Sequence, residues 1–458
     1  MAAAVAGFSF ADEPVADVKV AEFTGNAAVT WGVDLDDAGT GFKNEAEGKL
    51  KVNLVNKGSK STSGDGVWGE IGVEATGNIG LKSEATATGG EGTGFVHDGD
   101  NLGKVKVSAA KLHFGPVYVG IMSGDTKVGA FKVPNAIMSA DNDQAVRILD
   151  VGPGATHGIV AGYGDDNFGI DVDFRSTPNG ADYYNNNYAI AAEAKLKDSN
   201  AFVPGLSLDV GFAMPFESNA VVAASANAGY KLKMGDTYYL NPTVGWEMTT
   251  ATGTPMNLVG GVLFGWGDTA DANAGVPYLD GDYAKKVTPG VGVAVRLANL
   301  TSDTARALTV VPAFYSGDLI PNLKAGAVAE ITTPLTGSGS LSLGVAGGAK
   351  YTLAVGESIK IAPYAGARFI TGTTTTSVFG NTNTDNGNKG DMVRATVDGK
   401  LNNVLNVKAG CEFTGLISNT TFDVWYQSRN MMNTTDYSAN NAAKAVIGTI
   451  NLKCKISF

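Results

Sequence analysis

The sequence predicts an all-β protein, a transmembrane outer-membrane β-barrel of about 20 (18–22) antiparallel strands. Three observations predict this fold. The composition is rich in glycine and poor in charge, apolar and polar residues alternate along the whole chain, and the last segment has the pattern of a closing strand. Because side chains on a strand point alternately to opposite faces, such alternation gives each strand one apolar and one polar face.

The composition excludes several classes of protein. Glycine makes up 61 of the 458 residues and charged residues 17 %, against a usual charged share of about 25 %. The hydrophobic share of 44 % argues against a disordered chain. A net charge of −11 argues against a nucleic-acid partner, which needs a basic face. Two cysteines and three histidines leave little material for a zinc site. No metal, cofactor or enzymatic activity is expected.

The first residues have the pattern of a targeting segment. Ala2–Phe10 is apolar, and Ser9 and Ala11 are the small residues that a signal peptidase requires before a cut after Ala11. We therefore expect residues 1–11 to be a residual signal peptide and residues 12–458 to form a single barrel.

Alternation then continues to the end of the chain. In Asn167–Arg175 and Leu206–Met214, for example, every second residue is large and apolar. The segments have the length of tilted membrane-crossing strands, about 9–11 residues. The predicted strands are 20–35, 47–55, 66–76, 103–114, 116–122, 156–163, 167–175, 186–196, 206–214, 222–232, 237–249, 257–266, 287–297, 306–315, 323–331, 340–353, 358–370, 391–401, 404–414, 420–428 and 444–458.

Connections between the strands alternate imperfectly in length. Short turns on one rim and long loops on the other are typical of outer-membrane barrels. The long stretch 371–390 falls on the wrong rim if all 21 strands are real. We therefore expect the strand assignment between 371 and 405 to contain an error, in which one strand is missed or split. The sequence favours an even number of strands.

Alternating strands also occur in large soluble sandwiches and solenoids. Membrane insertion is favoured because the apolar face keeps its character throughout, and because about 21 antiparallel strands exceed what an open sheet holds without curling. The terminal segment 445–458 also alternates strictly and ends on Phe458. This ending resembles the C-terminal signal by which outer-membrane barrels are recognised for insertion.

Residues 27–55 carry a family resemblance. The run Thr30–Leu35, the following Gly41-Phe42-Lys43-Asn44 and the alternating Lys49–Val55 resemble the opening of the spirochaete (treponemal) major outer sheath protein (Msp) family. The resemblance implies a pore-forming protein of the outer sheath, commonly a trimer, that also binds host matrix proteins such as fibronectin. It also implies an N-terminal family region of about 12–200 and a C-terminal region of about 201–458. Some members are described with a periplasmic N-terminal region, but the unbroken alternation here favours one barrel.

A barrel of 16 or more strands leaves a water-filled channel, so the polar faces are expected to line it. The candidate pore-lining residues are Lys49, Lys51, Arg147, Asp171, Asp209, Glu247, Arg296, Arg368 and Arg394. Across all the predicted polar faces, 14 basic residues stand against 10 acidic ones, and this mixed charge with a slight basic excess predicts weak selectivity that leans to anions. The alternative is that many of these charges lie at the rims and do not affect permeation. Segment 134–155, with Arg147 and Asp150, is either an inward-folded constriction or a plain exposed loop.

Both cysteines lie on apolar faces. One strand separates the strand of Cys411 from that of Cys454, and strands two apart lie about 10 Å from each other. This distance is too long for a disulfide, so the sequence predicts two free thiols that face lipid.

The leading hypothesis for function is a porin that contacts outer-membrane lipid and lets small hydrophilic solutes diffuse. The alternative hypothesis is an adhesin that uses the barrel as a platform, because the Thr/Asn-rich loops 371–390 and 429–443 suit exposed binding.

Overall fold

A computed structural model gives the fold of the chain. It describes residues 21–36, 39–55, 67–77, 81–83, 95–97, 104–123, 157–179, 182–216, 222–250, 256–266, 275–279, 288–337, 339–371, 396–397, 400–401, 403–432 and 447–457. The predicted signal peptide, residues 1–11, and the terminal Phe458 lie outside this part of the chain. Among the described residues, no helix is long and apolar enough to cross a membrane.

The described elements are all strands. They are β1 (Ala21–Asp34), β2 (Thr40–Val55), β3 (Val67–Gly77), β4 (Leu81–Ser83), β5 (Phe95–His97), β6 (Lys104–Phe114), β7 (Val117–Ser123), β8 (His157–Gly164), β9 (Phe168–Asn179), β10 (Asp182–Leu196), β11 (Leu206–Pro215), β12 (Ala223–Tyr230) and β13 (Leu232–Met234). The second half of the chain contains β14 (Tyr238–Thr249), β15 (Asn257–Trp266), β16 (Gly290–Ala298), β17 (Ala307–Tyr315), β18 (Leu323–Pro334), β19 (Ser342–Tyr351), β20 (Leu353–Val355), β21 (Ile359–Thr371), β22 (Thr396–Val397), β23 (Lys400–Leu401), β24 (Val404–Thr414), β25 (Thr420–Gln427) and β26 (Thr449–Ser457).

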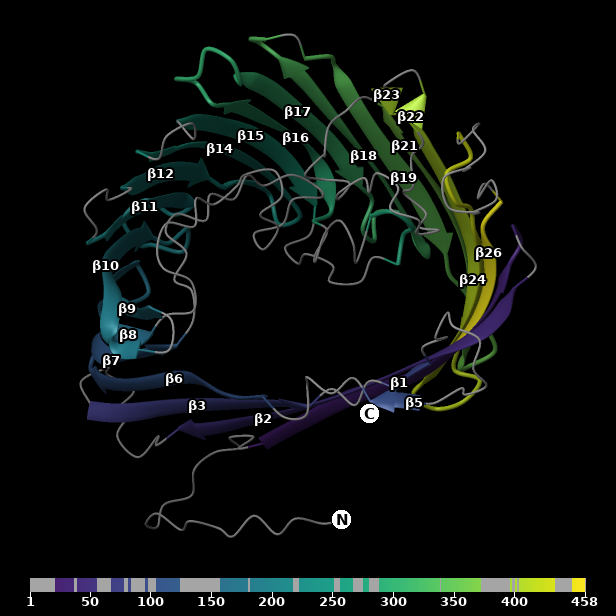
Figure 1. The fold of residues 1–458 in the computed structure, drawn as a ribbon, viewed down its shortest axis with the longest axis horizontal. Helices are drawn as coiled ribbons and strands as arrows, with labels where there is room; N and C mark the ends of the chain where they lie inside the picture. Colours follow the sequence, from purple (N-terminus) through teal and green to yellow (C-terminus); the bar gives the residue numbers. More distant parts are fainter. Residues whose placement is uncertain are drawn as a thin grey trace.

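The main sheet closes on itself (Figure 1). In the described part of the chain it contains 22 strands, each paired antiparallel with its neighbours, and β26 pairs back with β1. β12 and β13 both pair with β14, and β19 and β20 both pair with β21. Each of these pairs therefore occupies a single strand position in the ring. We call such a position a stave, and the ring has 20 staves. The prediction of a barrel with about 20 antiparallel strands is confirmed.

One predicted strand is not a stave of the barrel. Within 391–401, β22 and β23 pair with each other in a separate two-stranded sheet. Asp398-Gly399 separates them in the sequence, and this dipeptide favours two-residue hairpin turns. The alternation before and after this dipeptide therefore gave the sequence pattern of one continuous strand. Without it, the connection 372–403 returns to the rim of the other long loops, as an even number of strands requires.

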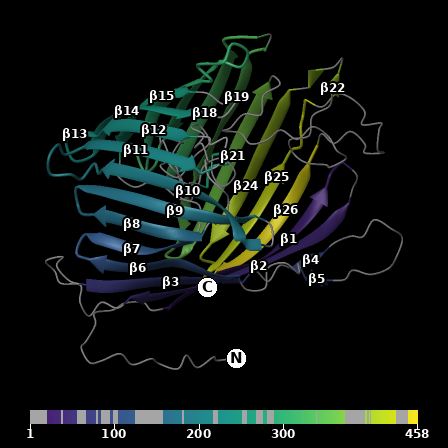
Figure 2. The ribbon, with the colours of Figure 1, turned by 60° about the vertical axis from the view of Figure 1, so that its left-hand side comes forward.

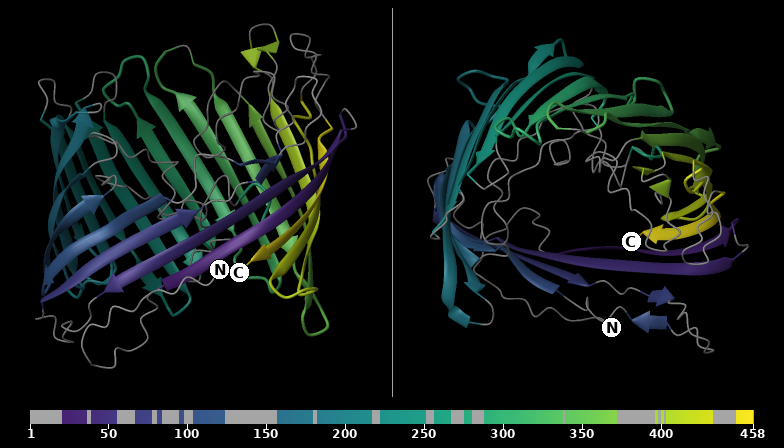
Figure 3. Two further views of the ribbon diagram at one scale, coloured as in Figure 1. Left: turned by 60° about the horizontal axis from the view of Figure 1, so that its bottom comes forward. Right: turned by 45° about the horizontal axis from the view of Figure 1, so that its top comes forward.

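The two rims differ in their connections. Figure 2 shows the inclined strands side by side, and β1 begins and β26 ends at the same rim (Figure 3). This short-turn rim carries tight connections such as 115–116, 165–167 and 235–237. The strands that are joined by the long connections 78–103, 124–156, 372–403 and 428–448 have those ends at the opposite rim, called the long-loop rim below. One long connection, 267–289, breaks this rule because it leaves from the short-turn rim.

The outward face of the ring is apolar. Exposed large side chains follow every second position, as Val119 and Ile121 do on β7 and as Val291 and Val295 do on β16. The residues between them, such as Ala294, are buried. This is the pattern of a barrel whose outer wall contacts hydrocarbon, because closure pairs every backbone group along the sheet.

The largest apolar cluster lies inside the ring and includes part of the connection 267–289. Residues 275–279 lie against the inner wall, where Val276 and Leu279 are fully buried. Burial of one such side chain stabilises by about 1.5–3 kcal/mol. Their partners in the cluster are Tyr239, Val259, Leu263, Ala294, Val311, Ala313, Tyr315, Val328, Ala346, Ile370 and Val404.

Both cysteines are free. Cys411 of β24 pairs with Val424 of β25, and Val424 pairs with Leu452 of β26. Cys454 lies two residues further along β26, opposite Phe422. The intervening strand keeps the thiols apart, and their neighbours belong to the outward apolar face. The prediction of two free thiols is confirmed.

An ionic cluster fastens the seam between β26 and β1 at the long-loop rim. Arg429 forms a bidentate ion pair with Asp34, at 2.7 and 2.8 Å, and a second ion pair with Asp36. Asp36 also accepts the backbone N–H groups of Ile447 and Gly448, which lead into β26, at 2.8 and 2.9 Å. The cluster therefore joins the ends of the two strands that close the ring.

The turn between β8 and β9 shows how a single carboxylate fixes a tight connection. Asp165 Oδ1 accepts the backbone N–H groups of Asn167 and Phe168 at 2.7 and 2.8 Å, and Oδ2 accepts the hydroxyl of Tyr163 at 2.8 Å. The hydrogen bond from Phe168 is the main cause that lowers the pKa of Asp165. A lowered pKa means that the stabilisation is complete above the usual carboxyl pKa and is lost as pH falls through the lowered value.

We therefore expect Asp165→Ala to reduce the hydrogen-exchange protection of Asn167 and Phe168, and we expect acidification below the usual carboxyl range to do the same in the wild type. Protection factors from mass spectrometry at two pH values measure this. Asp166→Ala, in the same turn, is the control. Equal loss of protection in both variants would show that the carboxylate of Asp165 does not hold the turn.

Candidate functional site

The inner surface of the ring carries the charged side chains. Asp171, Asp209, Glu247, Arg296 and Arg368 lie at inward positions of β9, β11, β14, β16 and β21, between outward apolar residues. Glu247 and Arg368 are buried, and the other three are half-buried. The structure thus brings these five predicted pore-lining residues to one surface.

The remaining predictions are placed incompletely. Lys49 and Lys51 lie in β2, opposite Thr24 and Glu22 of β1, but their side chains lie outside the described part of the chain. Three further residues, Arg147, Arg394 and Phe458, lie outside the described residues altogether, as does the predicted constriction 134–155.

One side of the inner wall is acidic. Asp171 and Asp173 of β9, Glu193 of β10 and Asp209 of β11 share the inward face. Lys195 is the one cation among the described inward side chains of these three strands, and its Nζ lies 2.7 Å from Glu193 and 3.8 Å from Asp209. Four carboxylates around one ammonium group give this stretch a negative potential.

Neighbouring strands stabilise the acidic side chains. The Tyr118 hydroxyl of β7 donates a hydrogen bond to Asp171, and Lys111 Nζ of β6 lies 4.4 Å from the centre of the Tyr118 ring. A cation over an aromatic face is worth about 0.5–2 kcal/mol. These contacts fix Asp171 on the wall.

The opposite side of the wall is basic. β21, β24 and β26 present Lys360, Arg368, Lys408, Lys453 and Lys455 at inward positions. Glu412 and Asp423 are the carboxylates among the described inward side chains of β21–β26. Cations therefore outnumber anions here.

Hydrogen bonds and aromatic rings fix these groups. Lys350 Nζ of β19 lies 2.9 Å from Glu412. The Tyr364 hydroxyl donates to both oxygens of Asp423, at 2.9 and 3.0 Å. Lys408 Nζ lies 5.9 Å from the ring centre of Tyr364. The result is an ordered charged surface.

The two sides face each other across the ring. In the order of strands, β9, β10 and β11 lie halfway round from β21, β24 and β25 (Figure 1). Because like charges gather on each side, the described side chains contribute an electric field that points across the lumen. Such a field acts on charged solutes within roughly a Debye length of the wall, about 8–10 Å near physiological salt.

A buried polar pair lies between the two sides. Asn257 Nδ2 of β15 donates to Glu247 Oε1 of β14 at 2.5 Å, and the two residues are direct cross-strand neighbours. Arg296 of β16 lies opposite Val259, two positions along β15 from Asn257. Its guanidinium adds a favourable charge for Glu247. A buried carboxylate is tolerated when it is hydrogen-bonded and near a cation.

Arg368 connects the wall to the inward segment 275–279. Its Nε donates to Asn406 Oδ1 of β24 at 2.9 Å, and its guanidinium lies 4.9 Å from the ring centre of Tyr278. Arg368 is 3 % exposed, so these two contacts, and not solvent, surround much of its charge.

Sequence reasoning missed Tyr278, Tyr364 and Asp423. Asp423 follows the same alternation as the rest of β25 and was detectable by period two. Tyr278 had no local signal, because it lies in a connection without periodicity.

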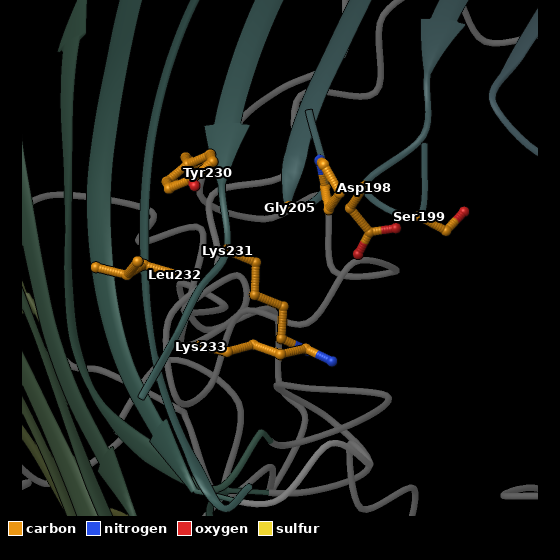
Figure 4. Close-up of a pocket in the computed structure, with 8 residues that line it drawn as sticks. Asp198, Ser199, Gly205, Tyr230, Lys231, Leu232 and Lys233 are labelled. Carbon is orange, nitrogen blue, oxygen red and sulfur yellow. The ribbon is translucent and has the colours of Figure 1, made fainter. Parts of the chain in front are cut away.

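A separate pocket lies at the short-turn rim (Figure 4). Its volume is about 490 Å³, and Asp198, Tyr230, Lys231 and Lys233 contribute to its lining. Lys231 Nζ lies 4.4 Å from the centre of the Tyr239 ring. None of the predicted pore-lining residues belongs to this pocket. No group of three or more metal-ligating side chains occurs within the described residues.

Two curated surface proteins match part of the chain. The major surface protein MspTL of Treponema lecithinolyticum is 45 % identical over 177 residues, which cover 38 % of this chain and 29 % of that protein. The major outer membrane protein MspA of Treponema maltophilum is 44 % identical over 173 residues, covering 36 % and 30 %. The matches thus span less than a third of either relative. They confirm the resemblance to the treponemal Msp family and the predicted outer-membrane location. No protein-family model matches the chain.

Solved porin structures are also similar to the chain, at low identity. OccK11 (OpdR) of Pseudomonas aeruginosa has a TM-score of 0.41 at 7 % identity, with 96 % of each chain covered. A porin refined at 1.8 Å resolution has a TM-score of 0.34 at 9 % identity, covering 96 % of this chain and 100 % of that one. The barrel described above rests on the strand pairings of this chain itself.

Proposed function

We propose that the chain forms a water-filled channel through which small hydrophilic solutes diffuse across the outer membrane. The observation that carries this proposal is the closed ring of 20 staves with an apolar outer face and charged side chains on the inner face. Barrels of 16 or more strands are too wide for side chains to fill and leave an aqueous channel.

The inner charges support weak ion selectivity with a lean toward anions. Both signs line the wall, so neither ion is excluded, but the described basic side chains outnumber the acidic ones slightly. The pore-lining role of Asp171, Asp209, Glu247, Arg296 and Arg368 belongs to this proposal.

The test is single-channel recording of purified, folded protein in a planar bilayer, together with swelling of liposomes in neutral sugars. We expect stepwise conductance increments and permeation by small sugars. In a salt gradient, the reversal potential should be small and of the sign of anion preference. A correctly folded protein that inserts but conducts no ions would overturn the proposal, and strong cation preference would overturn its selectivity.

The adhesive function, the trimeric assembly and the fibronectin partner stay predictions. Much of the long-loop rim, including 124–156 and 433–446, lies outside the described residues. Deleting a long loop separates the two functions, because loss of matrix-protein binding with unchanged conductance would show that both exist.

A further inference from the structure

Three glycines form a row across the inner wall. Gly326 of β18 pairs with Gly348 of β19, and Gly348 pairs with Gly366 of β21. The row continues to Tyr315 on one side and Lys408 on the other. Because glycine has no side chain, these three adjacent staves carry a shallow trough between bulkier neighbours.

The segment 275–279 fills this trough. A Cβ atom on Gly326 would lie 2.6 Å from Leu279 Cδ1, and one on Gly366 would lie 2.8 Å from Pro277 Cβ. A Cβ atom on Gly348 would lie 3.0 Å from the carbonyl oxygen of Pro277. Each glycine is therefore the residue that lets the segment approach the sheet so closely.

The segment is a tight turn whose backbone is itself strained. Leu279 N–H donates to the Val276 carbonyl at 3.1 Å, and Tyr278 has a φ of 62°. Proline at the second position and a positive φ at the third are the features of a type II turn. A bulky residue in the left-handed region is held there by its surroundings, and Tyr278 is held by burial and by the guanidinium of Arg368.

The position of this connection is unusual for its rim. It leaves from the short-turn rim, where the neighbouring connections 235–237 and 316–322 are much shorter, and its Pro277 reaches Gly366 in the middle of β21. Turns at that rim need no such length to join two staves. Within this connection, the described residues Val276–Leu279 lie against the inner wall and are buried there.

We propose that residues 275–279 are a docked pore-narrowing element, seated on the glycine row from the short-turn side, that sets the size limit of the channel. This inference rests on the proposed function, because it narrows the lumen that conducts. The segment lies beside Lys350 and Arg368 and acts through its bulk. It therefore limits passage by neutral solutes as well as by ions.

The test displaces the segment without altering its sequence. Gly366→Val places a branched side chain where Pro277 lies, and overpacking of this kind shifts a docking equilibrium by roughly tenfold or more. Gly169→Val is the matched control, because Gly169 is also an inward strand glycine and its nearest neighbour lies 3.7 Å from an added Cβ. We expect larger single-channel conductance and a higher sugar size limit for Gly366→Val alone.

A second measurement, thiol labelling, reports the docking of residues 275–279 independently of conductance. In a Cys411→Ala/Cys454→Ala background, Val276→Cys introduces a thiol at a position that is fully buried. A membrane-impermeant maleimide should react slowly with it, and roughly tenfold faster when Gly366→Val is added. Gly169→Val should leave the rate unchanged.

The outcomes separate the two proposals. Fast labelling of Val276→Cys without Gly366→Val would overturn the docking. If Gly366→Val speeds the labelling of Val276→Cys but leaves the conductance and the sugar size limit unchanged, the narrowing is overturned. If the wild type conducts nothing while Val276→Cys stays protected, the proposed function and the narrowing both fail, and the docking alone stands.

Discussion

Replacing Arg429 by methionine is expected to destabilise the closed barrel by about 3–5 kcal/mol, the usual cost of removing one partner from a largely buried ion pair. The side chain of Arg429 is 9 % exposed and that of Asp36 is 2 % exposed. Methionine keeps most of the length of the side chain but leaves the carboxylates of Asp34 and Asp36 without their counter-ion. Urea unfolding followed by tryptophan fluorescence, and the temperature at which the folded band converts on a gel, measure the loss.

The carboxylate of Asp34, and after it that of Asp36, raises the pKa of Arg429 against the opposing effect of burial. The guanidinium therefore stays charged as pH rises, and the cluster should not weaken through Arg429 in alkaline solution. Asp303→Asn is the matched control, since Asp303 is fully exposed and its ion pair with Arg306 spans 4.0 Å. If Arg429→Met loses no more stability than this control, the cluster does not fasten the seam.

The sequence predicted the staves well because their signal is local. Each stave must present one face to hydrocarbon and one to the lumen, so period two appears within every strand. In Phe168–Asn179, for example, Phe174 faces outward at 46 % exposed while Asp173 is 1 % exposed. The same alternation, which needs no knowledge of strand pairing, places Asp171, Asp209, Glu247, Arg296 and Arg368 on the inner face, and their role in lining a pore stays a prediction.

The missed features depend on register between distant segments. The row of Gly326, Gly348 and Gly366 exists because three strands pair at one particular offset, and no strand shows it alone. Tyr278 lies in a turn without periodicity. Asp34 and Arg429 are 395 positions apart and meet because the ring closes. Such contacts follow from topology and not from neighbouring residues.

The charged sides of the lumen should shift ion selectivity in opposite directions. Lys408→Gln with Lys453→Gln removes two cations from the basic side and should move the reversal potential in a salt gradient toward cation preference. Glu193→Gln with Asp209→Asn removes two anions from the acidic side and should move it toward anion preference. Both double variants exchange a charged group for a neutral one of similar size, so the width of the lumen changes little.

Screening gives this prediction a second signature. The Debye length is about 10 Å at 0.1 M salt and about 3 Å at 1 M, so both shifts should shrink as salt is raised, whereas a change in pore width would persist. Lys197→Gln removes a cation from the exposed turn between β10 and β11 and should leave the reversal potential near that of the wild type. Shifts of the same sign in the two double variants, or shifts that do not depend on salt, would contradict a field that acts across the lumen.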